Sequence, residues 1–153
     1  NLPEYVIDRT KYNIMECVMS EQQRLLCFFV DGTLKKIDLA DISNLEGVDK
    51  IIRNEKLYQS GKVGTGGYFV TFNDSIDISA RLLYERGERI PLRLGDFTAF
   101  VQNNVIDTTQ SCNILQCSRQ NVAYMVSHQQ MIPIKEDVRG NLYLKGDVIR
   151  NQW

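Results

Sequence analysis

Hydroxyl, guanidinium and amide side chains are concentrated in one short segment near the C-terminus. Ser118, Arg119, Gln120 and Asn121 are consecutive, and Tyr124 follows about one helical turn later. Arginine, glutamine and asparagine form paired hydrogen bonds with guanine and adenine edges in the major groove of DNA. A serine at the start of a helix, beside unpaired backbone amides, suits a phosphate group. A helix that exposes this segment would therefore bind DNA.

Two short helices are predicted to position these side chains. The first covers Thr108–Leu115 and is interrupted at Gln116, and Ser118 is a suitable N-cap for the second, which reaches His128. The inner faces carry Cys112 and Leu115 on the first helix, and Val122, Met125 and Val126 on the second. Two helices joined by a turn of about three residues form a helix-turn-helix. The alternative is an ordinary helical hairpin with a solvated outer face.

A pair of strands is predicted after the second helix, over Met131–Lys135 and Leu142–Leu144. Lys135 and Arg139 would lie on this hairpin, where we expect them to contact phosphate groups. Such a hairpin beside a helix-turn-helix is a wing.

Catalytic and metal-binding patterns are weak in this sequence. His128 is the one histidine, and nothing places a nucleophile and an orienting group beside it. Cys112 and Cys117 with His128 would need a fourth, distant ligand to hold zinc, so we expect reduced cysteines that pack between the helices. The glycines at 61–67 lack the Gly-Lys-Ser/Thr ending of a phosphate loop and favour a hairpin turn. We expect no enzyme activity, no cofactor and no metal.

Composition indicates an ordinary globular protein of 153 residues, with 43% hydrophobic residues and a net charge of −1. This charge argues against a strongly basic nucleic-acid binder, so any DNA site must be local. No run approaches the length of a membrane span, and the first residues do not resemble a signal peptide. We therefore expect a cytoplasmic protein without a membrane partner.

The first half of the chain has the pattern of short strands and turns. Arg24–Val30 is a continuous apolar run typical of a central strand, and Asp31-Gly32 predicts a hairpin turn after it. Leu57–Val63 and Tyr68–Phe72 would form a second hairpin, and Ile78–Arg86 a helix that ends at Gly87. The boundary with the second half is predicted within residues 88–95. Beyond it, Asp96 would cap a short helix to Asn103 that buries Phe97, Phe100 and Val101.

The C-terminal region, residues 107–148, resembles the excisionase/MerR-like helix-turn-helix domain. The matching pattern is Thr108-x3-Cys112-x2-Leu115-x-Cys117-Ser118-Arg119-Gln120-x-Val122, then Ile132-Pro133, Leu142-Tyr143-Leu144 and Lys145-Gly-Asp147-Val148. The resemblance implies that the second helix enters the major groove and that the hairpin is a wing on the DNA backbone. Gln116 occupies a turn where glycine is common, so a positive φ is expected at this residue.

The first half is similar to the bacterial domain-of-unknown-function family 2442. The matching pieces are Leu26-x-Phe28-x-x-Asp31-Gly32-x4-Ile37-Asp38-Leu39 and Phe69-x-x-Phe72-Asn73-Asp74-x-Ile76-Asp77-Ile78-Ser79-x2-Leu82-Leu83-Tyr84. The resemblance implies a small α/β domain that occurs beside helix-turn-helix domains, and it implies no activity.

Together these patterns predict an α+β protein with two domains. Residues 1–92 would form a small antiparallel sheet domain with short helices, and residues 93–153 a winged helix-turn-helix. The expected function is sequence-specific binding of double-stranded DNA by a homodimer in transcription regulation. The alternative is a non-catalytic protein-interaction module, such as an adaptor or antitoxin-like partner, with a degenerate helix-turn-helix.

Overall fold

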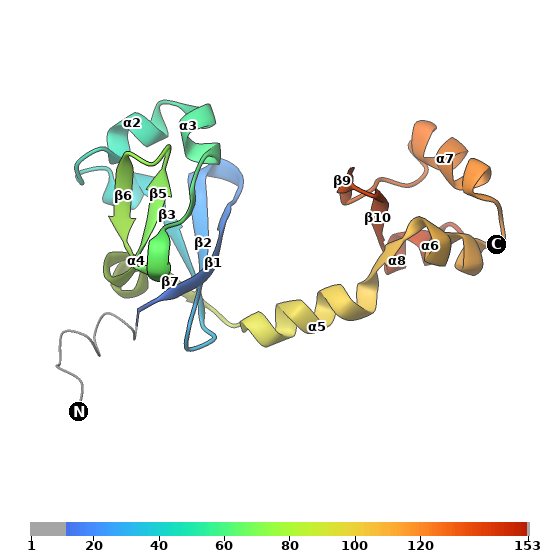
Figure 1. The fold of residues 1–153 in the computed structure, drawn as a ribbon, viewed down its shortest axis with the longest axis horizontal. Coiled ribbons are helices and arrows are strands. Elements are labelled where there is room, and N and C mark those ends of the chain that lie inside the picture. Colours follow the sequence, from blue (N-terminus) through green and yellow to red (C-terminus); the bar gives the residue numbers. More distant parts are fainter. Residues whose placement is uncertain (1–11, 153) are drawn as a thin grey trace. The chain divides into compact units, whose positions relative to one another are not determined.

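The chain is divided into two compact units, and each is described by itself. The computed structural model describes residues 12–152, apart from the side chains at positions 137, 138, 144, 146, 147 and 150. The first unit ends at Gly95 and the second begins at Asp96 (Figure 1). This division falls three residues after the predicted boundary. Arg93 and Leu94 belong to the first unit because Arg93 Nη2 donates to the Asp31 carbonyl at 2.6 Å and the Leu94 amide donates to the Gly32 carbonyl at 3.2 Å.

A four-stranded antiparallel sheet with strand order β1-β2-β3-β7 contains the predicted central strand. Its strands are β1 (Ile14–Met19), β2 (Arg24–Phe29), β3 (Leu34–Asp38) and β7 (Glu88–Ile90). β2 lies between β1 and β3, as its apolar run predicts. The hairpin at Asp31-Gly32 is also confirmed, since Gly32 has a φ of 86° and the Asp31 carboxylate accepts from the Thr33 amide at 2.9 Å.

A second antiparallel sheet has the strand order β4-β5-β6. It comprises β4 (Lys62–Val63), β5 (Phe69–Phe72) and β6 (Ile76–Ser79), and the unit's helices are α2 (Val48–Ile52), α3 (Glu55–Gln59) and α4 (Ala80–Arg86). Short 3-10 turns cover Glu21–Gln23, Leu39–Ile42 and Thr65–Gly67. The glycine-rich segment connects β4 to β5, so the hairpin prediction is confirmed there. Figure 1 shows α2 and α3 at one end of these strands.

Two predicted elements of the first unit are wrong in part because polar caps override their apolar patterns. The Asn54 side chain accepts from the Leu57 amide at 3.1 Å and starts α3, so the beginning of the predicted strand Leu57–Val63 is helical. Ser79 likewise accepts from the Leu82 amide at 3.2 Å and starts α4. Ile78, predicted to be helical, therefore lies in β6.

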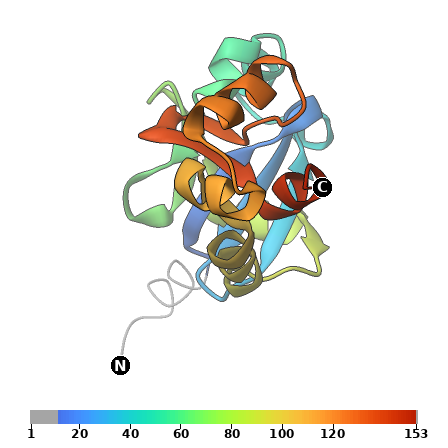
Figure 2. The same cartoon turned by 90° about the vertical axis from the view of Figure 1, so that its right-hand side faces the viewer.

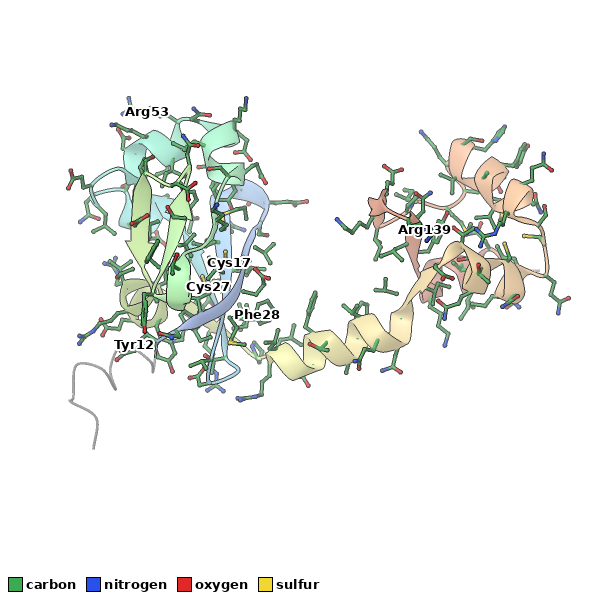
Figure 3. All side chains as sticks on the ribbon, viewed as in Figure 1. Tyr12, Cys17, Cys27, Phe28, Arg53 and Arg139 are labelled. Carbon is green, nitrogen blue, oxygen red and sulfur yellow. The ribbon has the colours of Figure 1, made fainter. Side chains whose placement is uncertain are left out.

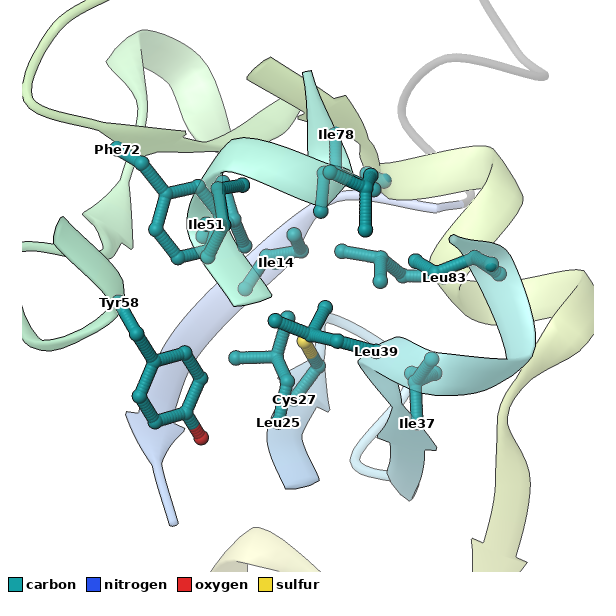
Figure 4. Packing of buried hydrophobic residues seen from close by; sticks show 14 of the residues in the cluster. Ile14, Leu25, Cys27, Ile37, Leu39, Ile51, Tyr58, Phe72, Ile78 and Leu83 are labelled. Atoms are coloured by element: carbon teal, nitrogen blue, oxygen red, sulfur yellow. The ribbon is translucent and has the colours of Figure 1, made fainter. Parts of the chain in front are cut away.

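The core of the first unit gathers side chains from both sheets and all three helices. Figure 4 shows Leu25 and Cys27 of β2 facing Ile51, Tyr58 and Leu83 of the surrounding elements. Tyr58 is fully buried, and its hydroxyl donates to the Ser20 carbonyl at 2.6 Å. That bond removes the cost of burying a phenol without a partner.

Helix α5 (Leu94–Asn104) differs from its prediction in both start and burial. It begins two residues before Asp96, which is therefore inside the helix and not its N-cap. Phe97, Phe100 and Val101 were expected to be buried, but they are 47%, 49% and 37% exposed. The spacing of these residues correctly indicated an apolar helix stripe, but spacing alone does not supply a surface to cover it.

The described part of the second unit contains most of α5, followed by three short helices and a three-stranded antiparallel sheet of order β8-β10-β9. Its elements after α5 are β8 (Val105–Asp107), α6 (Thr108–Leu115), α7 (Arg119–Ser127), β9 (Lys135–Val138), β10 (Gly140–Leu144) and α8 (Lys145–Arg150). Helix α6 packs against α7, α8 and β10 (Figure 2). Ile106, Val122, Met131, Tyr143 and Val148 form the buried core.

The hairpin of the second unit is shifted from its predicted position. The first predicted strand, Met131–Lys135, is replaced by β9, which begins at Lys135, and Met131 is a buried core residue. A single residue, Arg139, connects β9 to β10. Strand β8, which pairs with β10, was not predicted.

Both units thus contain small antiparallel sheets and short helices, so the mixed α and β class is confirmed. Among the described residues, no helix has the length and apolar character needed to cross a membrane.

Candidate nucleic-acid interface

Helix α6 is fixed at its start by a reciprocal pair of side-chain hydrogen bonds. Asp107 Oδ1 accepts from the Gln110 amide at 2.8 Å, and Gln110 Oε1 accepts from the Asp107 amide at 3.1 Å. This capping box satisfies two amides that a helix start otherwise leaves unpaired. The hydroxyl of the buried Ser111 donates to the Asp107 carbonyl at 2.8 Å. Both the amide and the carbonyl of Asp107 therefore have side-chain partners in the first turn of α6.

The connection between α6 and α7 is three residues long and depends on a left-handed backbone conformation. Gln116 has φ 53° and ψ 50°, which confirms the positive φ expected for this residue. The amides of Gln116 and Cys117 both donate to the Cys112 carbonyl, the latter at 3.2 Å. Ser118 Oγ then accepts from the Asn121 amide at 3.1 Å and starts α7. The predicted helix boundaries around this turn are confirmed to within one residue.

One face of α7 is apolar and packed, as predicted. Val122 is 1% exposed, and Met125 and Val126 pack against the same core cluster. With about 100° between successive helical residues, Gln120 and Tyr124 lie on the opposite face. Both are exposed.

The five residues predicted on the second helix are all exposed, four of them at its N-terminal end and Tyr124 just past its middle. They are Ser118, Arg119, Gln120, Asn121 and Tyr124. Ser118 uses its hydroxyl as the N-cap acceptor of α7. Arg119 and Asn121 lie on either side of the helix face that carries Gln120 and Tyr124. The structure therefore brings hydrogen-bonding side chains of three kinds to one helix end.

Two of these side chains have partners that sequence reasoning did not identify. Arg119 Nη2 donates to the Thr109 hydroxyl on α6, so it already contacts the neighbouring helix. The Tyr124 ring stacks on His128, with a distance of 3.8 Å between the ring centroids. The spacing of four residues between Tyr124 and His128 on a helix was the available signal for this stack. His128 therefore extends the exposed face of α7.

The two basic residues predicted on the hairpin are exposed in the structure. Lys135 begins β9 opposite Leu142, and Arg139 lies at the connection between β9 and β10 (Figure 3). The next residue, Gly140, has a φ of 89°, which permits this tight connection. The exposed Glu136 stands beside Lys135 and reduces the local positive charge.

A DNA interface would also require Lys145 and Arg150 to lie on the same face as Arg119, Lys135 and Arg139. Lys145 is exposed at the start of α8. The side chain of Arg150 lies outside the described part of the chain. The basic residues of this unit are therefore distributed over α7, the hairpin and α8.

The geometry does not join the residues considered for catalysis or metal binding. Cys117 precedes α7 and His128 follows it, and the nine residues of this helix span about 14 Å. These two side chains therefore do not form a nucleophile–base pair. Within the described residues, no group of three or more histidine, cysteine or acidic side chains is placed to hold a metal ion.

A hollow in the first unit is lined mainly by charged side chains of both signs. The basic residues are Arg24, Lys36 and Arg86, and the acidic residues are Asp38, Asp41 and Glu88. Arg24 pairs with Asp38 at 3.7 Å, and Arg86 donates to the Asp41 carbonyl at 3.2 Å. These charges balance one another, so the hollow favours neither an anionic nor a cationic ligand.

No protein-family model, curated protein or solved structure matches this chain.

Proposed function

We propose that the second unit is a winged helix-turn-helix that binds double-stranded DNA, and that the protein regulates transcription without catalysing a reaction. The observation that carries this proposal is the α6–α7 connection. A left-handed Gln116 and a Ser118 cap set two helices three residues apart, with the N-terminal half of the second helix exposed. Recognition helices of this class contact base edges with residues at that end.

Separate roles follow from where the side chains lie. Arg119 and Gln120 have the donor and acceptor geometry for guanine and adenine edges, and Asn121 can pair with adenine. Ser118 and the first amides of α7 suit a phosphate group. Lys135 and Arg139 on the β9–β10 hairpin would contact the DNA backbone, as a wing does. These two residues would add affinity without sequence information.

The protein is proposed to act as a homodimer in the cytoplasm. A single small module buries little surface on DNA, and a dimer doubles that surface. Helix α5 offers a surface for the second copy because Phe100 and Val101 are 49% and 37% exposed. Asp96 is the one charged residue between Leu94 and Asn104, so two copies of this helix would repel each other little.

The second candidate function is a protein-interaction module with a degenerate helix-turn-helix. Two features favour it: Arg119 uses one guanidinium donor on the Thr109 hydroxyl, and the exposed Glu136 beside Lys135 lowers the local positive charge. The two functions differ in whether the intact chain binds any duplex.

Selection from a pool of random-sequence duplexes, followed by sequencing, tests the proposal. The full chain is used near 50 mM salt, which favours phosphate contacts. Enrichment of a short motif, with half-sites if a dimer binds, is expected. A pool that remains random, together with no binding to unselected duplex, would replace DNA binding by the interaction-module function.

A further inference from the structure

The α6–α7 turn holds two thiols that the proposed DNA contact does not use. Cys112 lies in the last two turns of α6, and Cys117 follows the left-handed Gln116. The Cys117 amide donates to the Cys112 carbonyl at 3.2 Å, across the end of the helix. This hydrogen bond has the position of the outer bond of a Schellman motif, in which the two residues that it joins commonly make a side-chain contact.

Distance and direction both favour contact between these thiols. A hydrogen bond from the amide of one residue to the carbonyl of the other limits the separation of their Cα atoms to about 7 Å. Disulfides join residues whose Cα atoms are about 4.4–6.8 Å apart. Both side chains pack against the same core cluster, so they point to the same side of the turn.

Both thiols are also within reach of a small reagent. Cys112 and Cys117 are free and only partly buried. Cys117 additionally lines a surface hollow beside the turn, together with Gln116 and Asn121. A solvent-accessible thiol with a second cysteine nearby is an arrangement that favours oxidation to a disulfide.

We propose that Cys112 and Cys117, which the sequence predicts to be reduced packing residues, are also a thiol-oxidation site that closes to an intrachain disulfide and reopens on reduction. With hydrogen peroxide as the oxidant, one thiolate attacks a peroxide oxygen to give a sulfenic acid and one water. The second thiolate then attacks that sulfur, and the sulfenic oxygen leaves as a second water. The two S–H bonds are lost, one S–S bond forms, and the two electrons reduce the peroxide. This site does not depend on DNA binding.

A second pair of cysteines in the chain provides an internal comparison. Cys17 and Cys27 are directly opposite on β1 and β2 and lie close together in Figure 3. Burial, with a smaller contribution from Glu16, raises the pKa of Cys17 to about 12. Burial also raises the pKa of Cys27, whose side chain is fully covered. Because the thiolate is the reacting form, this pair is expected to react much more slowly.

Mass spectrometry of the oxidised full chain tests the proposal. Mild treatment with hydrogen peroxide should remove two hydrogens from the intact mass, and peptide mapping should join Cys112 to Cys117. Dithiothreitol should restore the mass. Cys112→Ser and Cys117→Ser should each abolish this loss, and the double variant Cys17→Ser/Cys27→Ser should retain it.

Three results would overturn the proposal. One is a bridge between Cys17 and Cys27 that forms before any at the turn. Another is sulfinic acid at Cys112 or Cys117 without a bridge. The third is no bridge between Cys112 and Cys117 although both alkylate readily in the folded chain.

Hydrogen exchange tests whether the reduced fold already holds the two thiols in position. In the bridged form, the Gln116 and Cys117 amides should exchange more slowly than in the reduced form, because the turn that pairs them is crosslinked. Faster exchange in the bridged form would show that the turn must open to form the bridge, which contradicts the proposal. This measurement uses the unsubstituted chain and does not depend on how the serine variants fold.

Discussion

Gln116 has a conformation that an L-residue adopts at a cost. Its φ of 53° ends α6 and directs the chain into α7. The left-handed region costs a residue with a side chain about 1–2 kcal/mol, whereas glycine adopts it freely. Within the described part of the chain no hydrogen bond to the Gln116 side chain offsets this cost, which is therefore set by the turn between α6 and α7.

Gln116→Gly should therefore stabilise the folded chain by about 0.5–1 kcal/mol, after the entropy that glycine adds to the unfolded state. Ala123→Gly, at an exposed right-handed position of α7, is the matched control and should destabilise by about 1 kcal/mol. Urea unfolding of both variants checks the pair. Equal destabilisation by the two glycines would contradict a left-handed conformation at Gln116.

Asp31 connects the β2–β3 turn to α4. Its Oδ2 accepts from the Tyr84 hydroxyl at 2.7 Å, and its Oδ1 from the Thr33 hydroxyl at 2.7 Å. Partial burial alone would raise the pKa of Asp31, but the hydrogen bonds from Thr33 and Tyr84 and the charge of Arg93 hold it below the ordinary 3.8. The hydrogen bond to Asp31 in turn raises the pKa of Tyr84.

This arrangement predicts a pH-dependent contribution to stability. A carboxyl whose pKa is lowered by folding stabilises the protein above its ordinary pKa, and this contribution is lost as the pH falls through the folded value. Tyr84→Phe should therefore destabilise the chain at pH 7, and the difference from the wild type should shrink below about pH 4. The Asp31→Asn side chain cannot ionise. The difference in stability between this variant and the wild type should therefore also shrink below about pH 4. Urea unfolding at both pH values measures it, and a constant difference would contradict the role of Asp31.

At the scale of elements, the sequence predicted best where local signals agree. α6 has an apolar stripe and a start predicted at Thr108, and α7 has an apolar stripe and the predicted cap Ser118. Both sets of boundaries are confirmed to within one residue. The exposed positions of the five predicted DNA contacts on α7 and its N-cap also follow from these patterns, whereas Lys135 and Arg139 are exposed on a hairpin whose position was predicted less well. Contact with DNA itself stays a prediction.

The missed elements lack such agreement because partners distant in the sequence create them. β7 and β8 have three residues each and exist through pairing with β3 and β10. The contact of Arg119 with Thr109 also joins two helices, and side-chain spacing within one helix does not reveal it. The burial predicted for α5 failed for the same reason, since a stripe does not determine what covers it.

An exposed strand edge gives little reason to assign dimer formation to the first unit. β7 is an edge of the four-stranded sheet, and it is short, with exposed Glu88 and Arg89. Short, charged edges disfavour pairing with another chain. The β7 edge therefore gives no support for a dimer, and α5 is the contact proposed for it.

Phe100→Ser should weaken the dimer because it removes an exposed aromatic side chain from the proposed contact. Gln102→Ser, roughly opposite on α5 and also exposed, is the matched control and should leave association unchanged. Sedimentation equilibrium of the full-length variants measures the difference. A wild type that stays monomeric, or variants that associate equally, would contradict the role of α5.

At the scale of the whole molecule, the net charge of −1 makes DNA binding depend on few contacts. Lys135 and Arg139 are expected to contact phosphate groups. Lys135→Ala or Arg139→Ala should lower affinity similarly for all duplexes and reduce the salt slope by about one unit. Titrations between about 50 and 200 mM salt measure the slope. An unchanged salt slope for both variants would show that the β9–β10 hairpin does not contact the DNA backbone.

DNA binding by α7 is tested most directly by the effect of Arg119→Ala on affinity for the duplex enriched from the random pool. Loss of a paired contact to guanine should cost about 1–3 kcal/mol and relax the preference at one base pair. Thr109→Val removes the partner of Arg119 on α6 and leaves the guanidinium in place, so it should retain the preference. Equal affinity of the wild type and Arg119→Ala for that duplex, with the same preference at every base pair, would contradict DNA reading by α7.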